Sequence, residues 1–138
     1  MKKSLKFIGD RLYYYSNGYK IVGVHKDIEG NNLNIFGDCS KIKGNVSHIS
    51  GNVTDIRGCV SNITGNVSSI YGDTSNILGC VSNLIGNVSL LCGNISGLLG
   101  NVSGISGDAT GIYGNLDECE IVKEERSKTV NINSLLQS

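Results

Sequence analysis

A glycine recurs at every seventh position from Gly23 to Gly114, and most of the units between these glycines read GNVSxIx. The period runs over fourteen glycines with no inserted or skipped residue. Numbered from its glycine, each unit usually has valine at position 3 and isoleucine or leucine at position 6. A strict period over about two-thirds of a chain means that one small structural unit is stacked many times.

Apolar residues spaced alternately three and four apart are also the signature of a coiled coil, so a helical fold has to be weighed first. Each heptad carries a glycine, which costs about 1 kcal/mol in a helix interior, together with Asn, Ser and Val, which are poor helix formers. The flanking positions lack the Glu and Lys that coiled coils use for solubility and register. Collagen needs glycine at every third residue and abundant proline, and this chain has no proline. Both helical folds are excluded.

The remaining fold is all-β, a single-chain β-solenoid (β-helix) of about fourteen heptads. We expect each heptad to form a short strand over Asn-Val-Ser, with valine inward, and then a bend that returns position 6 to the interior. Glycine at the corners would tolerate the positive φ of a tight bend. Stacking would align identical residues about 4.7 to 4.9 Å apart, giving structural ladders of Asn at position 2 and Ser/Thr at position 4. The predicted core ladder is Val46, Ile49, Val53, Ile56, Val60, Ile63, Val67, Ile70, Val81, Leu84, Val88 and Leu91.

Two coil sizes fit the period, fourteen or twenty-one residues, and the sequence leaves the handedness open. A coil of twenty-one residues would make a three-sided prism with Cys59 stacked directly on Cys80. We favour fourteen, because it separates one apolar outer column from a more polar one on the opposite side. The apolar column would hold Tyr71, Ile85, Leu99 and Tyr113.

Both ends are typical of caps, which a solenoid needs to avoid open-ended strand pairing. Residues 1–22 form the expected N-terminal cap, where Asn17-Gly18 between two β-prone runs predicts a type I′ hairpin. The solenoid is expected over residues 23–120. Residues 121–138 form the expected C-terminal cap, with a short helix over 121–128 and an apolar strip over 130–136.

The formal net charge is +0, so the chain has no overall electrostatic bias towards nucleic acid or an acidic membrane surface. The only charged residue between Gly58 and Gly107 is Asp73. The chain starts without the apolar run of a signal peptide, and it has no apolar segment of about twenty residues. Its five cysteines lack metal-site spacing and fit a reducing compartment. We expect a cytoplasmic protein with no metal or cofactor and with no nucleic-acid or membrane partner.

The tandem GNVSxIxGNVSxIxG, followed by GNLDECEIVKEER and VNINSLL, resembles heptapeptide-repeat β-helix proteins of bacteriophages and prophages. Their repeats look like GDVSGLxGDVSGLxG and close on a similar LDxC...EER...I..L segment. The resemblance covers residues 23–136 and implies a phage origin and a setting in the cytoplasm of the bacterial host, but no particular activity. This chain departs from the pattern by keeping aspartate at position 2 only at Asp38, Asp73 and Asp108. Its nearly uncharged shaft argues against mimicry of DNA by acidic ladders.

Catalytic motifs are absent from the sequence. His25 and His48 lie in different heptads, the aspartates of the shaft stand singly, and the glycines are explained by corners. We expect no enzymatic activity.

Position 7 changes along the chain and is the best indication of a binding surface. It faces outward in the simplest arrangement, and it is mostly polar or charged in the early heptads but apolar in the middle ones. An exposed uncharged patch marks a contact surface, whereas the alternative is that position 7 turns inward there and enlarges the core. The interface candidates are Tyr71, Leu78, Ile85, Leu90, Cys92, Leu99 and Tyr113.

These features predict a non-enzymatic binding protein that forms a homo-oligomer. The phage resemblance adds that it acts on a host component, a protein or small molecule that no motif identifies, for example by inhibiting a host defence or process. The alternative hypothesis is a structural rod, a homotrimer in a virion fibre or surface adhesin. A looser similarity to the β-roll heads of trimeric adhesins covers only the period and the composition.

Overall fold

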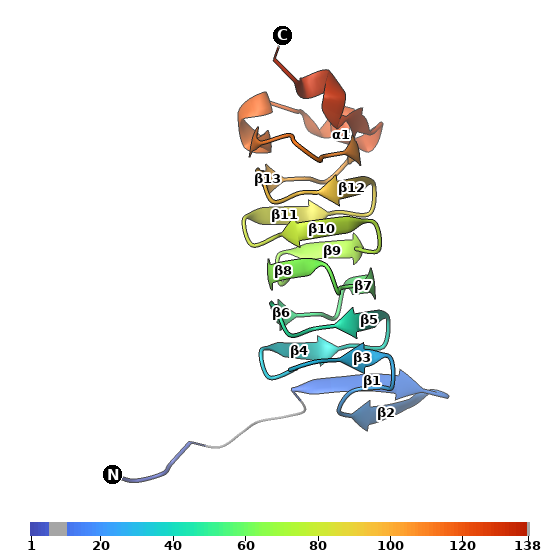
Figure 1. Cartoon of the computed structure of the whole chain (residues 1–138), viewed down its shortest axis with the longest axis vertical. Coiled ribbons are helices and arrows are strands. Elements are labelled where there is room, and N and C mark those ends of the chain that lie inside the picture. The colour runs from blue at the N-terminus through green and yellow to red at the C-terminus, as the bar shows by residue number, and fades with distance from the viewer. Residues whose placement is uncertain (6–10, 138) are drawn as a thin grey trace.

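The computed structural model describes residues 1–5 and 11–137. Residues 6–10 of the expected N-terminal cap and Ser138 of the expected C-terminal cap lie outside the described residues. The chain forms a rod of stacked parallel coils, with a hairpin at one end and a short helix near the other (Figure 1). The prediction of an all-β solenoid is confirmed.

Two sheets form the sides of the rod in the described part of the chain, and successive repeat strands alternate between them. One coil therefore contains two heptads, which confirms fourteen residues per coil and excludes twenty-one. The nine-stranded sheet contains β1 (Leu12–Ser16), β2 (Tyr19–Val22), β4 (Ile35–Asp38), β6 (Ile49–Asn52), β8 (Ile63–Asn66), β10 (Ile77–Cys80), β12 (Leu91–Asn94), β14 (Ile105–Asp108) and β16 (Val130–Asn131). The seven-stranded sheet contains β3 (Ile28–Glu29), β5 (Ile42–Asn45), β7 (Ile56–Cys59), β9 (Ile70–Asp73), β11 (Leu84–Asn87), β13 (Leu98–Asn101) and β15 (Gly114–Asn115).

The full-length repeat strands cover positions 6, 7, 1 and 2, so the predicted Asn-Val-Ser strand is wrong. The Val-Ser-x-Ile segment is a β-turn, in which the Ile63 N–H donates to the Val60 carbonyl at 3.1 Å. The asparagine before the valine closes this turn with its side chain. In the next heptad the Ser68 N–H donates to Asn66 Oδ1 at 2.9 Å. An asparagine that satisfies the N–H two residues later favours a turn over an extended strand.

The repeated glycine lies inside the strand and not at a corner, which corrects a second expectation. Gly51 has φ +102°, a conformation that glycine adopts without the penalty of a side chain. The next coil also crosses close to it. A Cβ atom on Gly51 would lie under 3.0 Å from both Ser68 Oγ and Asn66 Oδ1. Position 1 therefore needs glycine for its backbone conformation and for space.

Neighbouring coils are offset along the strand direction. Ile49 pairs with Gly65 and Ser50 with Asn66, which is sixteen residues on, although two heptads span fourteen. Identical residues therefore do not stack directly, and the predicted Asn and Ser ladders are wrong. Instead, the Ser68 hydroxyl accepts a hydrogen bond from the Asn52 N–H of the coil before, at 2.8 Å.

This offset turns each coil relative to the previous one. Because the strands on the two sides run in opposite directions, a shift of two residues in sixteen rotates the coil by roughly one-eighth of a turn. Figure 1 shows the rotation: β3 and β4 lie across the view, β6 and β7 are closer to end-on, and β9 to β11 lie across it again. Equivalent side chains thus follow a winding path around the rod.

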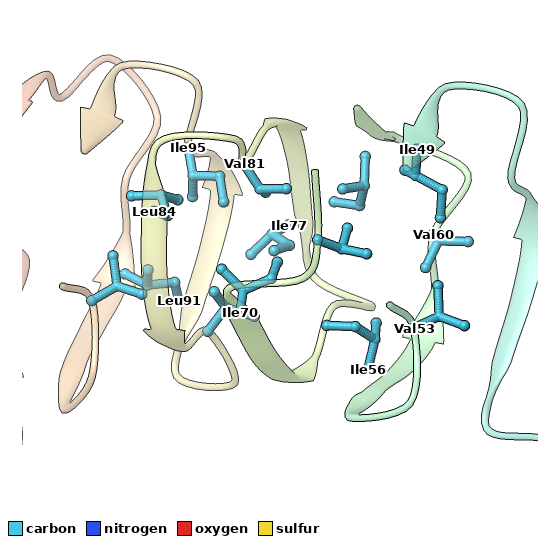
Figure 2. Packing of buried hydrophobic residues seen from close by; sticks show 14 of the residues in the cluster. Ile49, Val53, Ile56, Val60, Ile70, Ile77, Val81, Leu84, Leu91 and Ile95 are labelled. Carbon is cyan, nitrogen blue, oxygen red and sulfur yellow. The ribbon is translucent and has the colours of Figure 1, made fainter. Parts of the chain in front are cut away.

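The interior is filled by positions 3 and 6. All twelve residues of the predicted core ladder are buried, and the most exposed of them, Ile70, is 3% exposed. Figure 2 shows such side chains, among them Val81, Leu84 and Leu91, packed between the strands of the two sides. Thr74 replaces valine in one heptad, and its hydroxyl is satisfied by the carbonyls of Arg57 and Cys59 at 3.1 and 3.3 Å.

The N-terminal cap is the predicted hairpin. Strands β1 and β2 pair antiparallel with Ser16 opposite Tyr19. Asn17 and Gly18 between them have φ of 53° and 82°, as a type I′ turn requires. Because β1 also pairs with β4, the hairpin extends the nine-stranded sheet beyond the first coils.

The C-terminal cap contains the predicted short helix, within narrower bounds than expected. It consists of η1 (Leu116–Cys119), α1 (Lys123–Ser127), β16 and η2 (Ile132–Leu135). Two hydrogen bonds from Arg126 connect α1 to the last coils, since its Nη1 donates to the carbonyls of Asn101 and Ser103 at 2.8 and 2.7 Å. Ile132 is 1% exposed and closes the end of the core.

Candidate interaction surface

Position 7 faces outward because side chains alternate along a strand and position 6 points inward. In β9, Ile70 is buried whereas Tyr71 is 47% exposed. The apolar residues at position 7 therefore lie on the surface and do not enlarge the core.

Four of the seven interface candidates follow the seven-stranded sheet. Tyr71, Ile85 and Leu99 lie on β9, β11 and β13, and Tyr113 immediately precedes β15. Their side chains are 47, 49, 39 and 86% exposed, respectively. The offset between coils places them on a diagonal, and we call this set the apolar line.

The other three candidates belong to the nine-stranded sheet. Leu78 lies on β10, Cys92 lies on β12, and Leu90 lies in the turn that precedes β12. Leu78 and Leu90 are 42 and 48% exposed, and Cys92 is half-buried. We call these three residues the second apolar cluster. The structure thus divides the candidates between two sides of the rod.

The seven-stranded sheet is charged in its first half and apolar in its second. Position 7 is occupied by Glu29 in β3, Lys43 in β5 and Arg57 in β7. Beyond β7 the same position carries only the apolar line. Beside Leu99 and Tyr113, position 5 of each heptad is glycine, so no side chain there competes for the surface.

Asp73 is the only charged residue between Gly58 and Gly107. Its Oδ1 accepts the Ser75 N–H at 2.9 Å, the turn-closing contact that asparagine makes in other heptads. Hydrogen bonds from the Ser75 hydroxyl and then from its N–H hold the pKa of this carboxyl below its ordinary value. The aspartate thus replaces the usual asparagine in a structural contact.

Two cysteines also occupy position 2, where a sulfur atom stands in place of the asparagine oxygen. Hydrogen bonds from the side chain and backbone of Ser61 lower the pKa of Cys59, and those from the backbone and side chain of Ser82 lower the pKa of Cys80. Burial raises the pKa of Cys39. Within residues 1–5 and 11–137, no group of three His, Cys, Asp or Glu side chains could hold a metal ion.

A groove at the C-terminal end was not foreseen from the sequence. It has a volume of about 490 Å³ and lies between the last repeat turn, η1 and η2. Its residues come from positions 98 to 137, so no local window contains it. A signal was present nonetheless, because one short apolar strip, residues 130–136, cannot cover both halves of an open coil.

No helix among the described residues has the length and apolar character needed to cross a membrane. Comparisons of the chain with protein-family models, curated proteins and solved structures find no match.

Proposed function

We propose that this chain is a non-enzymatic binding protein of phage or prophage origin, which forms a homo-oligomer through the apolar line and acts on a component of the host bacterium. The observation that carries the proposal is the change at position 7 of one sheet, from charged residues in β3, β5 and β7 to apolar residues in β9, β11 and β13. The backbone is alike in both halves, so the coils do not need exposed apolar side chains to hold together.

The area of the apolar line supports a contact between two copies. Taking a fully exposed large side chain as about 200 Å², the exposed parts of the four residues sum to roughly 400 Å². Interfaces are about 60% apolar, so the whole contact would cover roughly 700 Å² on each partner. A standard interface uses about 800 Å² per partner, so the summed area is that of a small dimer. Because the line winds over roughly three-eighths of a turn from Tyr71 to Tyr113, the two copies have to wrap around each other for all four residues to take part.

The second apolar cluster stays available when two copies meet through the apolar line, because it lies on the other sheet. We assign the host component to this cluster. Leu78, Leu90 and Cys92 offer an uncharged surface, which suits an apolar patch on a protein better than a nucleic acid or an anionic membrane.

Analytical ultracentrifugation tests the self-association. At physiological ionic strength, where the charge-steered contact between rod ends is screened, we expect the wild type to dimerise and Ile85→Glu to lose this dimer at the same concentration, because the charge would be desolvated at the centre of the contact. Thr64→Glu is the matched control, since Thr64 is an exposed position-7 residue on the other sheet. A monomeric wild type, or an unchanged Ile85→Glu variant, contradicts the proposal. A threefold mass would favour the homotrimeric rod.

The host component is tested separately. Tagged wild type, Leu78→Glu and Ser50→Glu would be expressed in a host bacterium and purified, and any recovered protein would be titrated against each purified variant. We expect Leu78→Glu alone to lose binding, because Ser50 holds position 7 on the same sheet outside the cluster. Equal binding to all three variants would remove the cluster as the contact surface.

A further inference from the structure

We propose that the C-terminal groove binds the N-terminal segment of a second copy, residues 2–5, so that copies associate head to tail. This contact shares only Tyr113 with the apolar line and does not rest on Tyr71, Ile85 or Leu99. It uses the opposite ends of the rod, which lie far apart in Figure 1.

The groove has an apolar floor and an exposed apolar rim. Ile112, Leu116 and Ile132 form part of its lining, and the last two are buried, at 4 and 1% exposed. Tyr113 and Leu136 line it as well but are 86 and 54% exposed. A volume of about 490 Å³ falls in the range of sites that enclose a ligand.

The groove exists because the cap covers the two sheets unequally. Strand β16 extends the nine-stranded sheet past β14, whereas the seven-stranded sheet ends at β15 within the described residues. Strand β15 has only two residues, Gly114 and Asn115, and both line the groove. An extended segment could therefore lie along this end of the sheet and place one apolar side chain in the groove, as in recognition by strand addition.

Residues 2–5 have the chemistry that fits. Leu5 is 97% exposed and Figure 1 shows this segment directed away from the rod. Lys2 and Lys3 are also exposed. The segment thus offers one large apolar side chain next to two positive charges.

The charge around the groove selects this occupant. Residues 116–120 carry Asp117, Glu118 and Glu120 and no basic residue. The nearest basic residues in sequence belong to the α1 region, and the guanidinium of Arg126 is directed to the Asn101 and Ser103 carbonyls. Opposite charge on the two surfaces steers them together and disfavours contact between two C-terminal ends.

Reciprocal charge reversal tests the pairing by sedimentation velocity at low ionic strength. All proteins carry Ile85→Glu, so that association through the apolar line does not contribute. We expect Lys2→Glu/Lys3→Glu and Glu118→Lys/Glu120→Lys each to weaken association about tenfold, as the loss of two exposed ion pairs implies. All four residues are exposed, and both variants should fold as the parent does.

Mixing the two variants gives the sharper result. The reversed segment of one variant matches the reversed groove of the other, so association returns. The ends that remain are a native groove on the first variant and a native segment on the second, which also match, so the two variants alternate in open-ended assemblies. The mean mass of these mixed assemblies should rise with concentration, as it does for the parent protein. A mixture that stays monomeric, or a parent that does not associate, overturns the proposal.

Cross-linking locates the contact without substitution in the groove. Cys119 lines the groove and its thiol is exposed. With equal amounts of isotopically heavy and light protein, a short amine-to-thiol linker should join Cys119 of one copy to Lys2 or Lys3 of another. Mass spectrometry that finds these lysines linked only within one copy, or not linked to Cys119, contradicts the assignment.

Discussion

The substitution Gly51→Ala tests the two reasons why position 1 needs glycine, which are its backbone conformation and the close approach of the next coil. A φ of +102° costs an L-residue about 1–3 kcal/mol. The new Cβ would also displace Ser68 Oγ and Asn66 Oδ1, which accept hydrogen bonds of 2.8 Å from the Asn52 N–H and 2.9 Å from the Ser68 N–H. Each hydrogen bond contributes about 0.5–1.5 kcal/mol, so we expect Gly51→Ala to lower the free energy of unfolding by about 2–6 kcal/mol.

Gly23 is the matched control, because it shares the conformation but not the contact. Its φ is +113°, and a Cβ atom there would meet nothing within 4 Å. We expect Gly23→Ala to lower the free energy of unfolding only by the cost of the backbone conformation, about 1–3 kcal/mol. Gly93 and Gly114 repeat the comparison near the other end of the rod. A Cβ atom on Gly93 would clash with Asp108 and Thr110 oxygens, whereas one on Gly114 would be unobstructed.

The assay combines urea unfolding, followed by far-ultraviolet circular dichroism, with amide hydrogen exchange. Exchange is needed because stacked repeats can unfold coil by coil, and then one global free energy is poorly defined. The Asn52 amide proton should lose protection in Gly51→Ala and keep it in Gly23→Ala. If Gly51→Ala and Gly23→Ala lower the free energy of unfolding equally, and the Asn52 amide stays protected, the close approach between coils is refuted.

Three further perturbations follow from the same contacts. Cys59→Asn should stabilise the fold by about 0.5–1.5 kcal/mol in urea unfolding, because an amide oxygen accepts the Ser61 N–H better than sulfur does. The lowered pKa values of Asp73 and Asp108 mean that their stabilisation is complete above the unfolded pKa of about 3.9 and is lost as pH falls through the folded values. Changing both to asparagine should therefore flatten the loss of stability below about pH 4 in thermal melts. Ile63→Asp should prevent folding, because Ile63 is 1% exposed and the charge would be buried unpaired.

The cysteine and isoleucine substitutions each have a matched control. Cys92→Asn, at position 7, should leave stability unchanged because no turn N–H depends on that side chain. Thr64→Asp places a charge one residue beyond Ile63 on the exposed face and should fold. A parallel loss of stability in the controls would mean that these substitutions act through something other than the contacts described.

The sequence predicted the solenoid, the two-heptad coil, the hairpin and the terminal helix, because each has a local signal. The hairpin follows from Asn17-Gly18 alone, and the core follows from the spacing of positions 3 and 6. The strand within each heptad was misassigned because valine has high β-propensity and glycine has low β-propensity. The better signal was Asn-x-Ser itself, since the asparagine side chain of Asn66 closes a turn two residues later.

The offset between coils could not be predicted in the same way. It depends on contacts between residues sixteen apart, such as the Asn52 N–H with Ser68 Oγ, which no short window contains. The outward direction of position 7 was predictable, and the two-heptad coil already grouped Tyr71, Ile85, Leu99 and Tyr113 on one side. Their winding path around the rod was not predicted, because it follows from the offset between coils. The groove needed the cap, which brings Ile132 from beyond α1 to line the same groove as Leu116 and Leu98.

The contacts that build the coil leave the side chains of positions 5 and 7 free, and this separation of roles can be tested directly. The side chain of position 4 accepts a hydrogen bond from the neighbouring coil, the side chain of position 2 closes the turn, and positions 3 and 6 fill the core. Positions 5 and 7 contribute their backbone carbonyls to the bonds between coils. Replacing Tyr71, Ile85 and Leu99 by lysine should therefore change stability little, by about 0.5 kcal/mol or less per site. The same variant should lose all association through the apolar line in ultracentrifugation. If the variant unfolds instead, the apolar line stabilises the coils themselves. Its exposed apolar side chains then no longer support the proposal that two copies associate through them.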